Sequence, residues 1–143
     1  MDYLNKKFIT KTSRKLNWKE AIELSARPLL DMKYISTSYI NRLKELIANT
    51  EHMYLGNSVA IPHAETEDNV FFDGISILIS ETPVSFPNND KVHLVVTLAI
   101  KDNTKHLNAM TQLLNLSNND EEIEKILNMS ESQVYDFIEK IEK

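Results

Sequence analysis

The chain contains no cysteine, so it can form no disulfide, no thiolate zinc site and no cysteine nucleophile. This absence fits a protein of the reducing cytoplasm. Only two of the 143 residues are glycine, Gly56 and Gly74. Two isolated glycines cannot build the glycine-rich loop that holds phosphate in P-loop and dinucleotide-binding proteins. Any phosphate that this protein handles must therefore be held in another way.

Long apolar runs and a surplus of basic residues are also missing. The longest apolar segment, residues 92–100, is interrupted by His93 and Thr97 and is too short to cross a bilayer. Residues 1–15 are polar and basic, without the apolar centre of a cleavable signal. The formal net charge is -5, which argues against a nucleic-acid partner. We expect a soluble, cytoplasmic protein that does not bind nucleic acid directly.

The residues that are present predict one globular domain over residues 1–143, because 42% of them are hydrophobic and 26% are charged. Residues 1–16 are interpreted as an N-terminal extension of this domain. Asn17 can cap a first amphipathic helix, and Ser36 or Thr37 can open a second. After residue 100 the helical period returns in three segments, around residues 107–114, 123–127 and 134–141.

The middle of the chain favours strands, since its short segments are apolar or β-branched. These segments are residues 54–55, 58–61, 74–80 and 92–100. Residues 81–91 contain two prolines and a polar run, which predicts a surface connection. The predicted fold class is therefore α/β, with a mixed β-sheet of about five strands sandwiched by helices on both faces.

His63 is the first candidate for chemistry. In Val59-Ala60-Ile61-Pro62-His63-Ala64, proline lacks a backbone N–H and keeps Ile61 extended, so strand pairing ends there and His63 emerges at the carboxyl end of the strand. Ligands collect at that edge of α/β sheets. The competing interpretation is a structural histidine that follows a strand.

His106 is the second candidate. Asn103 or Thr104 can cap a helix that has His106 in its first turn, after the strand at residues 92–100. The positive end of a helix dipole disfavours imidazolium and favours an anion, so a neutral His106 beside a phosphate is physically reasonable. Its alternative is an ordinary surface histidine.

The other two histidines carry weaker signals. His93 is expected near the start of its strand, facing a loop or capping the sheet edge, and is assigned no role. His52 is interpreted as a solvated turn residue. A zinc site made of His63, His106 and Glu65 is disfavoured, because the histidine spacing of zinc enzymes is absent. No metal or other cofactor is expected.

Three segments of the chain together match a known pattern. They are Leu55-Gly56-Asn57-Ser58-Val59-Ala60-Ile61-Pro62-His63-Ala64, Gly74-Ile75-Ser76-Ile77-Leu78-Ile79 with Pro83-Val84-Ser85-Phe86, and residues 92–100 leading into His106-Leu107. In these segments the chain resembles the enzyme IIA domains of the bacterial phosphoenolpyruvate-dependent sugar phosphotransferase system, of the mannitol, fructose and ascorbate type. The resemblance extends from about Trp18 to Ile141.

The resemblance implies a phosphotransferase with a phosphohistidine intermediate. His63 would accept a phosphoryl group from the histidine-containing phosphocarrier protein and pass it to a cysteine of an enzyme IIB during sugar uptake. His106 would be the second histidine of the site and would support the phosphorylated one. The membrane would be involved only indirectly, through the IIC transporter.

The chain departs from this family before the histidine motif. Many members carry an arginine on the preceding helix and a Ser-Thr pair, whereas an ungapped count back from His63 gives Ile47 and His52-Met53. An expected phosphate clamp is therefore missing. This departure keeps a second hypothesis open, in which the domain belongs to a sugar-responsive transcription regulator and is phosphorylated for signalling.

The basic residues near the N-terminus also fit the regulatory hypothesis, as the stub of a linker. They are Lys6, Lys7, Lys11, Arg14 and Lys15. A third hypothesis, a small-molecule-binding domain without phosphotransfer, explains neither His63 nor His106.

Overall fold

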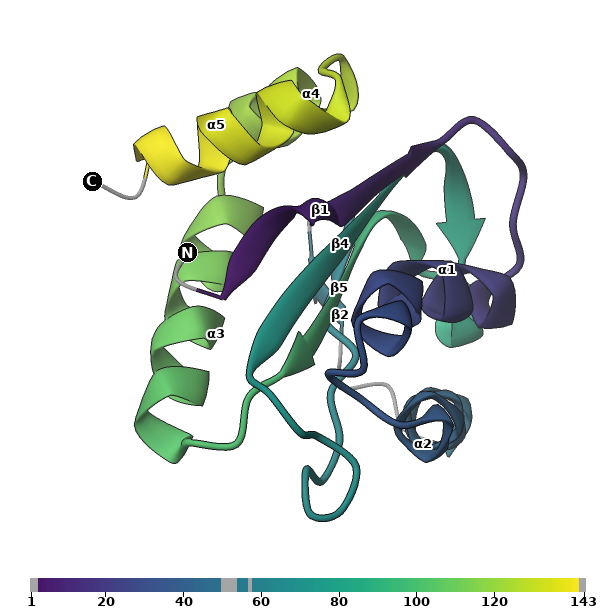
Figure 1. Cartoon of the computed structure of the whole chain (residues 1–143). Helices are drawn as coiled ribbons and strands as arrows, with labels where there is room; N and C mark the ends of the chain where they lie inside the picture. Colours follow the sequence, from purple (N-terminus) through teal and green to yellow (C-terminus); the bar gives the residue numbers. More distant parts are fainter. Residues whose placement is uncertain (1–2, 50–53, 57, 142–143) are drawn as a thin grey trace.

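The computed structural model describes residues 3–49, 54–56 and 58–141 (Figure 1). Along the chain the elements are β1 (Leu4–Thr12), α1 (Trp18–Asp31), α2 (Thr37–Asn49), β2 (Tyr54–Gly56), β3 (Val59–Ala60), β4 (Gly74–Ser85), the short 3-10 helix η1 (Pro87–Asn89), β5 (Lys91–Ala99), α3 (Asn103–Ser117), α4 (Asp120–Leu127) and α5 (Glu131–Ile141). None of the helices in the described part of the chain is long and apolar enough to span a membrane.

The strands form one mixed sheet in the order β1-β4-β5-β3-β2. The pairs β1–β4 and β3–β5 are parallel, whereas β4–β5 and β2–β3 are antiparallel. Helices α1 and α2 lie on one side of the sheet, and α3, α4 and α5 lie on the other (Figure 1). The predicted α/β class and the two helical layers are confirmed. Strands β2 and β3 are short, with three and two residues, so β1, β4 and β5 make up most of the sheet.

The core lies between the central strands and the helices that cover them. Residues Gly74 to Ser80 of β4 are all buried, because helices cover both faces of the sheet at this point. Helix α1 begins with the predicted cap: the Asn17 side chain accepts a hydrogen bond from the Glu20 N–H, and the Glu20 carboxylate accepts one from the Asn17 N–H. This reciprocal pair satisfies two backbone donors at the start of the helix.

Within the N-terminal extension at residues 1–16, residues 4–12 form the edge strand β1, which the sequence analysis did not predict. Leu4, Phe8 and Ile9 are buried against the core. The pairing of β1 with β4 shifts register between Leu4 and Ile9, so the apolar positions do not alternate as in a regular strand. This irregular spacing hides the strand from a sequence pattern.

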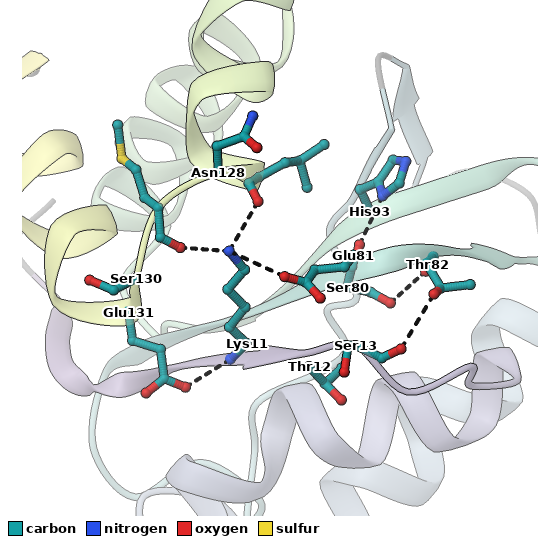
Figure 2. Close-up of polar contacts among 12 residues, drawn as sticks. Lys11, Thr12, Ser13, Ser80, Glu81, Thr82, His93, Asn128, Ser130 and Glu131 are labelled. Carbon is teal, nitrogen blue, oxygen red and sulfur yellow. Dashed lines mark hydrogen bonds and ion pairs between the residues drawn. The ribbon is translucent and has the colours of Figure 1, made fainter.

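Lys11 connects β1 to the helical layer (Figure 2). Its ammonium group donates hydrogen bonds to the carbonyl oxygens of Leu127, at 3.0 Å, and Met129, at 2.7 Å, and lies 3.6 Å from the Glu81 carboxylate. The Lys11 backbone N–H donates to the Glu131 carboxylate at 2.8 Å. The carbonyls at the carboxyl end of α4 thus gain a cationic donor, which a helix C-terminus favours. Lys11 therefore belongs to the folded domain and not to a linker.

Strand β4 also differs from its prediction, since it continues from Ser80 through Pro83 to Ser85. Its pairing with β5 shifts register between Ile79 and Val84, and the Ser80 hydroxyl donates to the Thr82 carbonyl at 2.6 Å. Proline cannot donate to a strand ladder, and an irregularity of this kind accommodates it. The predicted connection at residues 81–91 is thereby reduced to residues 86–90.

Candidate functional site

His63 follows the end of β3, as the sequence predicts. The Pro62 carbonyl accepts a hydrogen bond from the Leu98 N–H of β5 at 3.1 Å, and this bond holds the chain against the sheet one residue before His63. The Nδ1 atom of His63 lies 2.8 Å from the Ile61 carbonyl oxygen. A carbonyl oxygen only accepts, so Nδ1 carries the proton and the lone pair of the neutral ring is on Nε2.

His106 is the fourth residue of α3, and its N–H donates to the Asp102 carbonyl at 2.9 Å. The N-cap is Asp102, whose side chain accepts from the Lys105 N–H at 2.9 Å; the prediction of Asn103 or Thr104 as the cap is wrong by one or two residues. The helix begins earlier than expected because Asp102 has an extended backbone and its carboxylate accepts a hydrogen bond from the first turn of α3.

The two candidate rings lie next to each other, with centroids 5.4 Å apart and planes inclined by 62°. Strands β3 and β5 are parallel, so their carboxyl ends meet at one edge of the sheet, and three residues separate the end of β5 from the start of α3. His63 comes from the first strand and His106 from the helix after the second. The fold therefore brings together the two histidines that the sequence analysis selected.

The environment of the pair disfavours the protonated form of His106. Partial burial lowers the pKa of His106 below its ordinary value of 6.5, and the nearby His63 ring lowers it further. The position of His106 in the first turn of α3 acts in the same direction. A neutral imidazole retains both a donor and an acceptor nitrogen.

Glu65, two residues after His63, is engaged by an arginine. Both guanidinium contacts from Arg42 of α2, Nε to Oε2 and Nη2 to Oε1, measure 2.9 Å, and Arg42 also contacts Glu45 at 2.6 Å. The Arg42 guanidinium lowers the pKa of Glu65 to about 2. Glu65 thus forms an ion pair with Arg42. The described residues contain no group of three His, Cys, Asp or Glu side chains arranged to hold a metal ion.

Two residues beside the site have no signal in the sequence analysis. Arg42 reads as an ordinary polar position on the outer face of α2. Tyr39 lies in the first turn of α2, fully buried, and its hydroxyl donates to the Leu98 carbonyl at 2.7 Å and accepts from the Ala64 N–H at 3.2 Å. Ile47, the residue at the counted arginine position, is buried in the core. Hydrogen bonds between residues this far apart in the chain leave no local pattern.

The remaining histidines do not join the pair. His93 lies on β5, half-buried, with Nδ1 at 2.8 Å from the Ser80 carbonyl oxygen of the neighbouring strand β4. It is near the amino end of β5, whereas the candidate site is at the carboxyl end. His52 lies outside the described residues.

Comparison with known proteins gives the same assignment for nearly the whole chain. Residues 2–141 match the family described as phosphoenolpyruvate-dependent sugar phosphotransferase system, EIIA 2. The mannitol-specific cryptic phosphotransferase enzyme IIA component of Escherichia coli is 34% identical over 142 residues, covering 97% of each chain. The mannitol-specific enzyme IIA component of Halalkalibacterium halodurans is 29% identical over 118 residues, covering 80% of this chain and 78% of its own.

Solved structures agree with these sequence matches. The solution structure of the cryptic mannitol enzyme IIA from Escherichia coli superposes with a TM-score of 0.86 at 34% identity and 97% coverage of both chains. The Escherichia coli mannitol enzyme IIA, solved in complex with phosphorylated enzyme IIB, gives a TM-score of 0.80 at 25% identity and covers 94% of this chain and 95% of its own. The chain therefore belongs to the EIIA 2 family of the phosphoenolpyruvate-dependent sugar phosphotransferase system and is a phosphotransferase of the enzyme IIA type.

Proposed function

We propose that Nε2 of His63 is the phosphoryl acceptor of this enzyme IIA. The observation that carries the proposal is the second imidazole beside it, since the ring centroids of His63 and His106 are 5.4 Å apart. The 2.8 Å contact between His63 Nδ1 and the Ile61 carbonyl supports the choice of nitrogen, because a proton on Nδ1 leaves the nucleophilic lone pair on Nε2. An uncharged imidazole with a fixed tautomer is a competent nucleophile at neutral pH. The candidate ring lies at the carboxyl edge of the sheet, where a partner protein can approach it.

The donor is the phosphohistidine of the histidine-containing phosphocarrier protein. The Nε2 lone pair of His63 attacks phosphorus in line, the new N–P bond forms, and the donor nitrogen recovers its electron pair as the old N–P bond breaks. The His63 ring gains positive character during this step. The Ile61 carbonyl stabilises that charge at the Nδ1–H, so one hydrogen bond serves both the tautomer and the transition state.

His106 supports the phosphorylated ring. Its pKa is lowered by burial and by His63, which disfavours its protonated form before phosphate arrives. A ring N–H of His106 then donates to a phosphoryl oxygen across the short gap between the two imidazoles, whose centroids are 5.4 Å apart. The dianionic phosphoryl group in turn favours protonation of His106, which balances the added charge.

The acceptor is a cysteine of an enzyme IIB. A thiolate attacks the same phosphorus, the N–P bond breaks, and His63 returns to its neutral tautomer without any metal or nucleotide. The Escherichia coli relative that was solved in complex with phosphorylated enzyme IIB supports this class of partner for the present chain. The membrane takes part only indirectly, through the IIC transporter.

The test is transfer of label from phosphoenolpyruvate through enzyme I and the phosphocarrier. We expect one acid-labile phosphoryl group per chain, and its loss in His63→Ala. His93→Ala is the matched control, because that ring also holds Nδ1 at 2.8 Å from a carbonyl oxygen but lies at the other end of the sheet. Undiminished label in His63→Ala contradicts the assignment.

The same assay separates transport from regulation. Label passed onward to an enzyme IIB supports the transport function, whereas label that is accepted but delivered to no enzyme IIB supports the regulatory hypothesis. Lys6, Lys7 and Lys11 no longer favour that hypothesis, because residues 4–12 form a strand of the sheet and Lys11 is bound within the fold.

A further inference from the structure

We propose that Tyr39 is a positioning residue for His63: its buried hydroxyl holds the backbone beside the histidine and thereby orients the imidazole for phosphoryl transfer. This inference rests on the function proposed for His63. Tyr39 lies 24 positions before that residue in the chain, on a different element, and takes no direct part in the chemistry. Its role follows from a set of hydrogen bonds that meet at Leu98 of β5.

Leu98 is the fixed point of this arrangement. Its N–H donates to the Pro62 carbonyl at 3.1 Å, immediately before His63. Its carbonyl accepts the Tyr39 hydroxyl at 2.7 Å, and that hydroxyl accepts the N–H of Ala64, immediately after His63, at 3.2 Å. The backbone on both sides of His63 is therefore attached to one residue of a buried central strand.

A phenol suits this position better than other side chains. Burial raises the pKa of Tyr39 to about 12, so the hydroxyl keeps its proton throughout the working range of the protein. The proton is directed at the Leu98 carbonyl, which leaves the oxygen lone pairs for the Ala64 N–H. Phenylalanine has nearly the same shape but provides neither contact, so the buried Leu98 carbonyl and the partly buried Ala64 N–H lose this partner.

The attachment matters because it lies next to a segment without regular structure. Residues 61–73 contain no helix or strand. Two hydrogen bonds hold the far end of this segment: the Ser36 N–H donates to the Asn69 carbonyl at 2.9 Å, and the Phe71 N–H donates to the Tyr34 carbonyl at 2.8 Å. The contact between His63 Nδ1 and the Ile61 carbonyl needs the backbone near His63 to keep one orientation. Tyr39 supplies that restraint at Ala64.

The main experiment compares Tyr39→Phe with the wild-type protein in single-turnover phosphorylation by the phosphorylated phosphocarrier protein. We expect the saturating rate to fall about tenfold, since displacement of a reacting group by a fraction of an ångström has effects of this order. The half-saturating phosphocarrier concentration should not change, because Tyr39 is fully buried and contacts no partner. Nitrogen-15 spectra of the His63 ring should show a single Nδ1–H tautomer in the wild type and a mixture in Tyr39→Phe.

Ser25→Ala is the matched control. The Ser25 hydroxyl is also buried and donates to a β5 carbonyl, that of Val95, at 2.7 Å, but it lies on α1 away from residues 62–64. It should lower thermal stability as Tyr39→Phe does, without changing the rate or the His63 tautomer. A folded Tyr39→Phe protein with the wild-type rate and tautomer overturns the proposal, and so does a Ser25→Ala protein with the same kinetic and tautomer defects.

A measurement on the wild-type protein keeps the proposal testable if Tyr39→Phe does not fold. The Ala64 amide should be protected from hydrogen exchange; rapid exchange of that amide contradicts the attachment to Tyr39. Tautomer and exchange data also separate this inference from the proposed function. If label appears on a residue other than His63, the phosphoryl-acceptor proposal fails, whereas the hold of Tyr39 on the backbone is still judged by the spectra.

Discussion

His63 and His93 lie at opposite ends of the central sheet, and each ring makes the same kind of contact with a backbone carbonyl. His63 and His93 each hold Nδ1 at 2.8 Å from a backbone carbonyl oxygen, that of Ile61 in one case and that of Ser80 in the other. The difference lies in what surrounds them. His63 has a second imidazole 5.4 Å away at the start of a helix, whereas His93 sits between two paired strands. A fixed tautomer alone therefore does not define a reactive histidine.

The charged groups differ between the two ends as well. At the His93 end, the Lys11 ammonium is bound by the carbonyls of Leu127 and Met129, at and just after the end of α4, and by Glu81, as Figure 2 shows. At the His63 end, Glu65 is exposed and its partner Arg42 partly exposed, and the histidine pair is half-buried. Polar groups at one end are used to join the layers of the fold, and those at the other end remain accessible to a partner. Four predictions test this contrast.

The largest effect is expected for His106→Ala. We proposed that His106 donates to the phosphoryl group, so its loss should slow uptake of label about 10²-fold, as removal of one preorganised donor does in other enzymes, without abolishing the acceptor. His93→Ala should keep the wild-type rate. Rapid-quench measurement of phosphorylated protein checks both. Equal rates for His106→Ala and wild type would reduce His106 to a bystander.

Lys11→Met should give the opposite result, a loss of stability with phosphoryl transfer unchanged. Methionine keeps the apolar stem but removes the ammonium from the Leu127 and Met129 carbonyls, so we expect a loss of about 2 kcal/mol, typical of charged hydrogen bonds. Urea unfolding measures this loss. The exposed Lys7→Met is the control and should be nearly neutral. A slower transfer rate in folded Lys11→Met would show that the two ends are coupled.

The third prediction concerns Glu65, whose pKa is lowered from 4.5 to about 2, mainly by its hydrogen bonds to Arg42. A carboxyl with a lowered pKa in the folded state binds fewer protons than in the unfolded state. Its contribution to stability is thus complete above pH 4.5 and is lost as the pH falls toward 2. Carboxyl carbon NMR should follow this titration, and Arg42→Ala should return the pKa of Glu65 toward 4.5. A Glu65 that titrates near 4.5 in the wild type would contradict the ion pair.

The smallest effect is expected for the pKa of His106. Burial is the main cause of its lowering and the His63 ring the lesser one, so His63→Ala should raise it only part of the way to 6.5. Because unfolded His106 takes up its proton at a higher pH than folded His106, acidification below pH 6.5 lowers the free energy of unfolding until the folded ring is also protonated. Proton NMR titration of the His106 ring measures both. Full recovery to 6.5 in His63→Ala would make the charge of His63 the main cause.

Much of the fold and of the candidate site was open to prediction because the relevant signals are local. Pro62, just before His63, ends the pairing of a short strand, and helical periodicity marks each of the helices after residue 100. Strand β1 was not predicted, because its register shift removes the alternation of buried positions. Pro83 suggested a connection, although the irregular pairing of β4 accommodates it within the strand.

By itself, the sequence determined where the two histidines stand on their elements: His63 just beyond a strand stopped by proline, and His106 at the start of a helix. Only the tertiary structure decided that the two ring centroids lie 5.4 Å apart, that the Tyr39 hydroxyl links the Ala64 N–H to the Leu98 carbonyl, and that Arg42 pairs with Glu65. The physical reason is range. Caps, prolines and periodicity act over a few neighbouring residues, whereas these contacts join residues 23 to 59 positions apart and exist only once the sheet has aligned its strands.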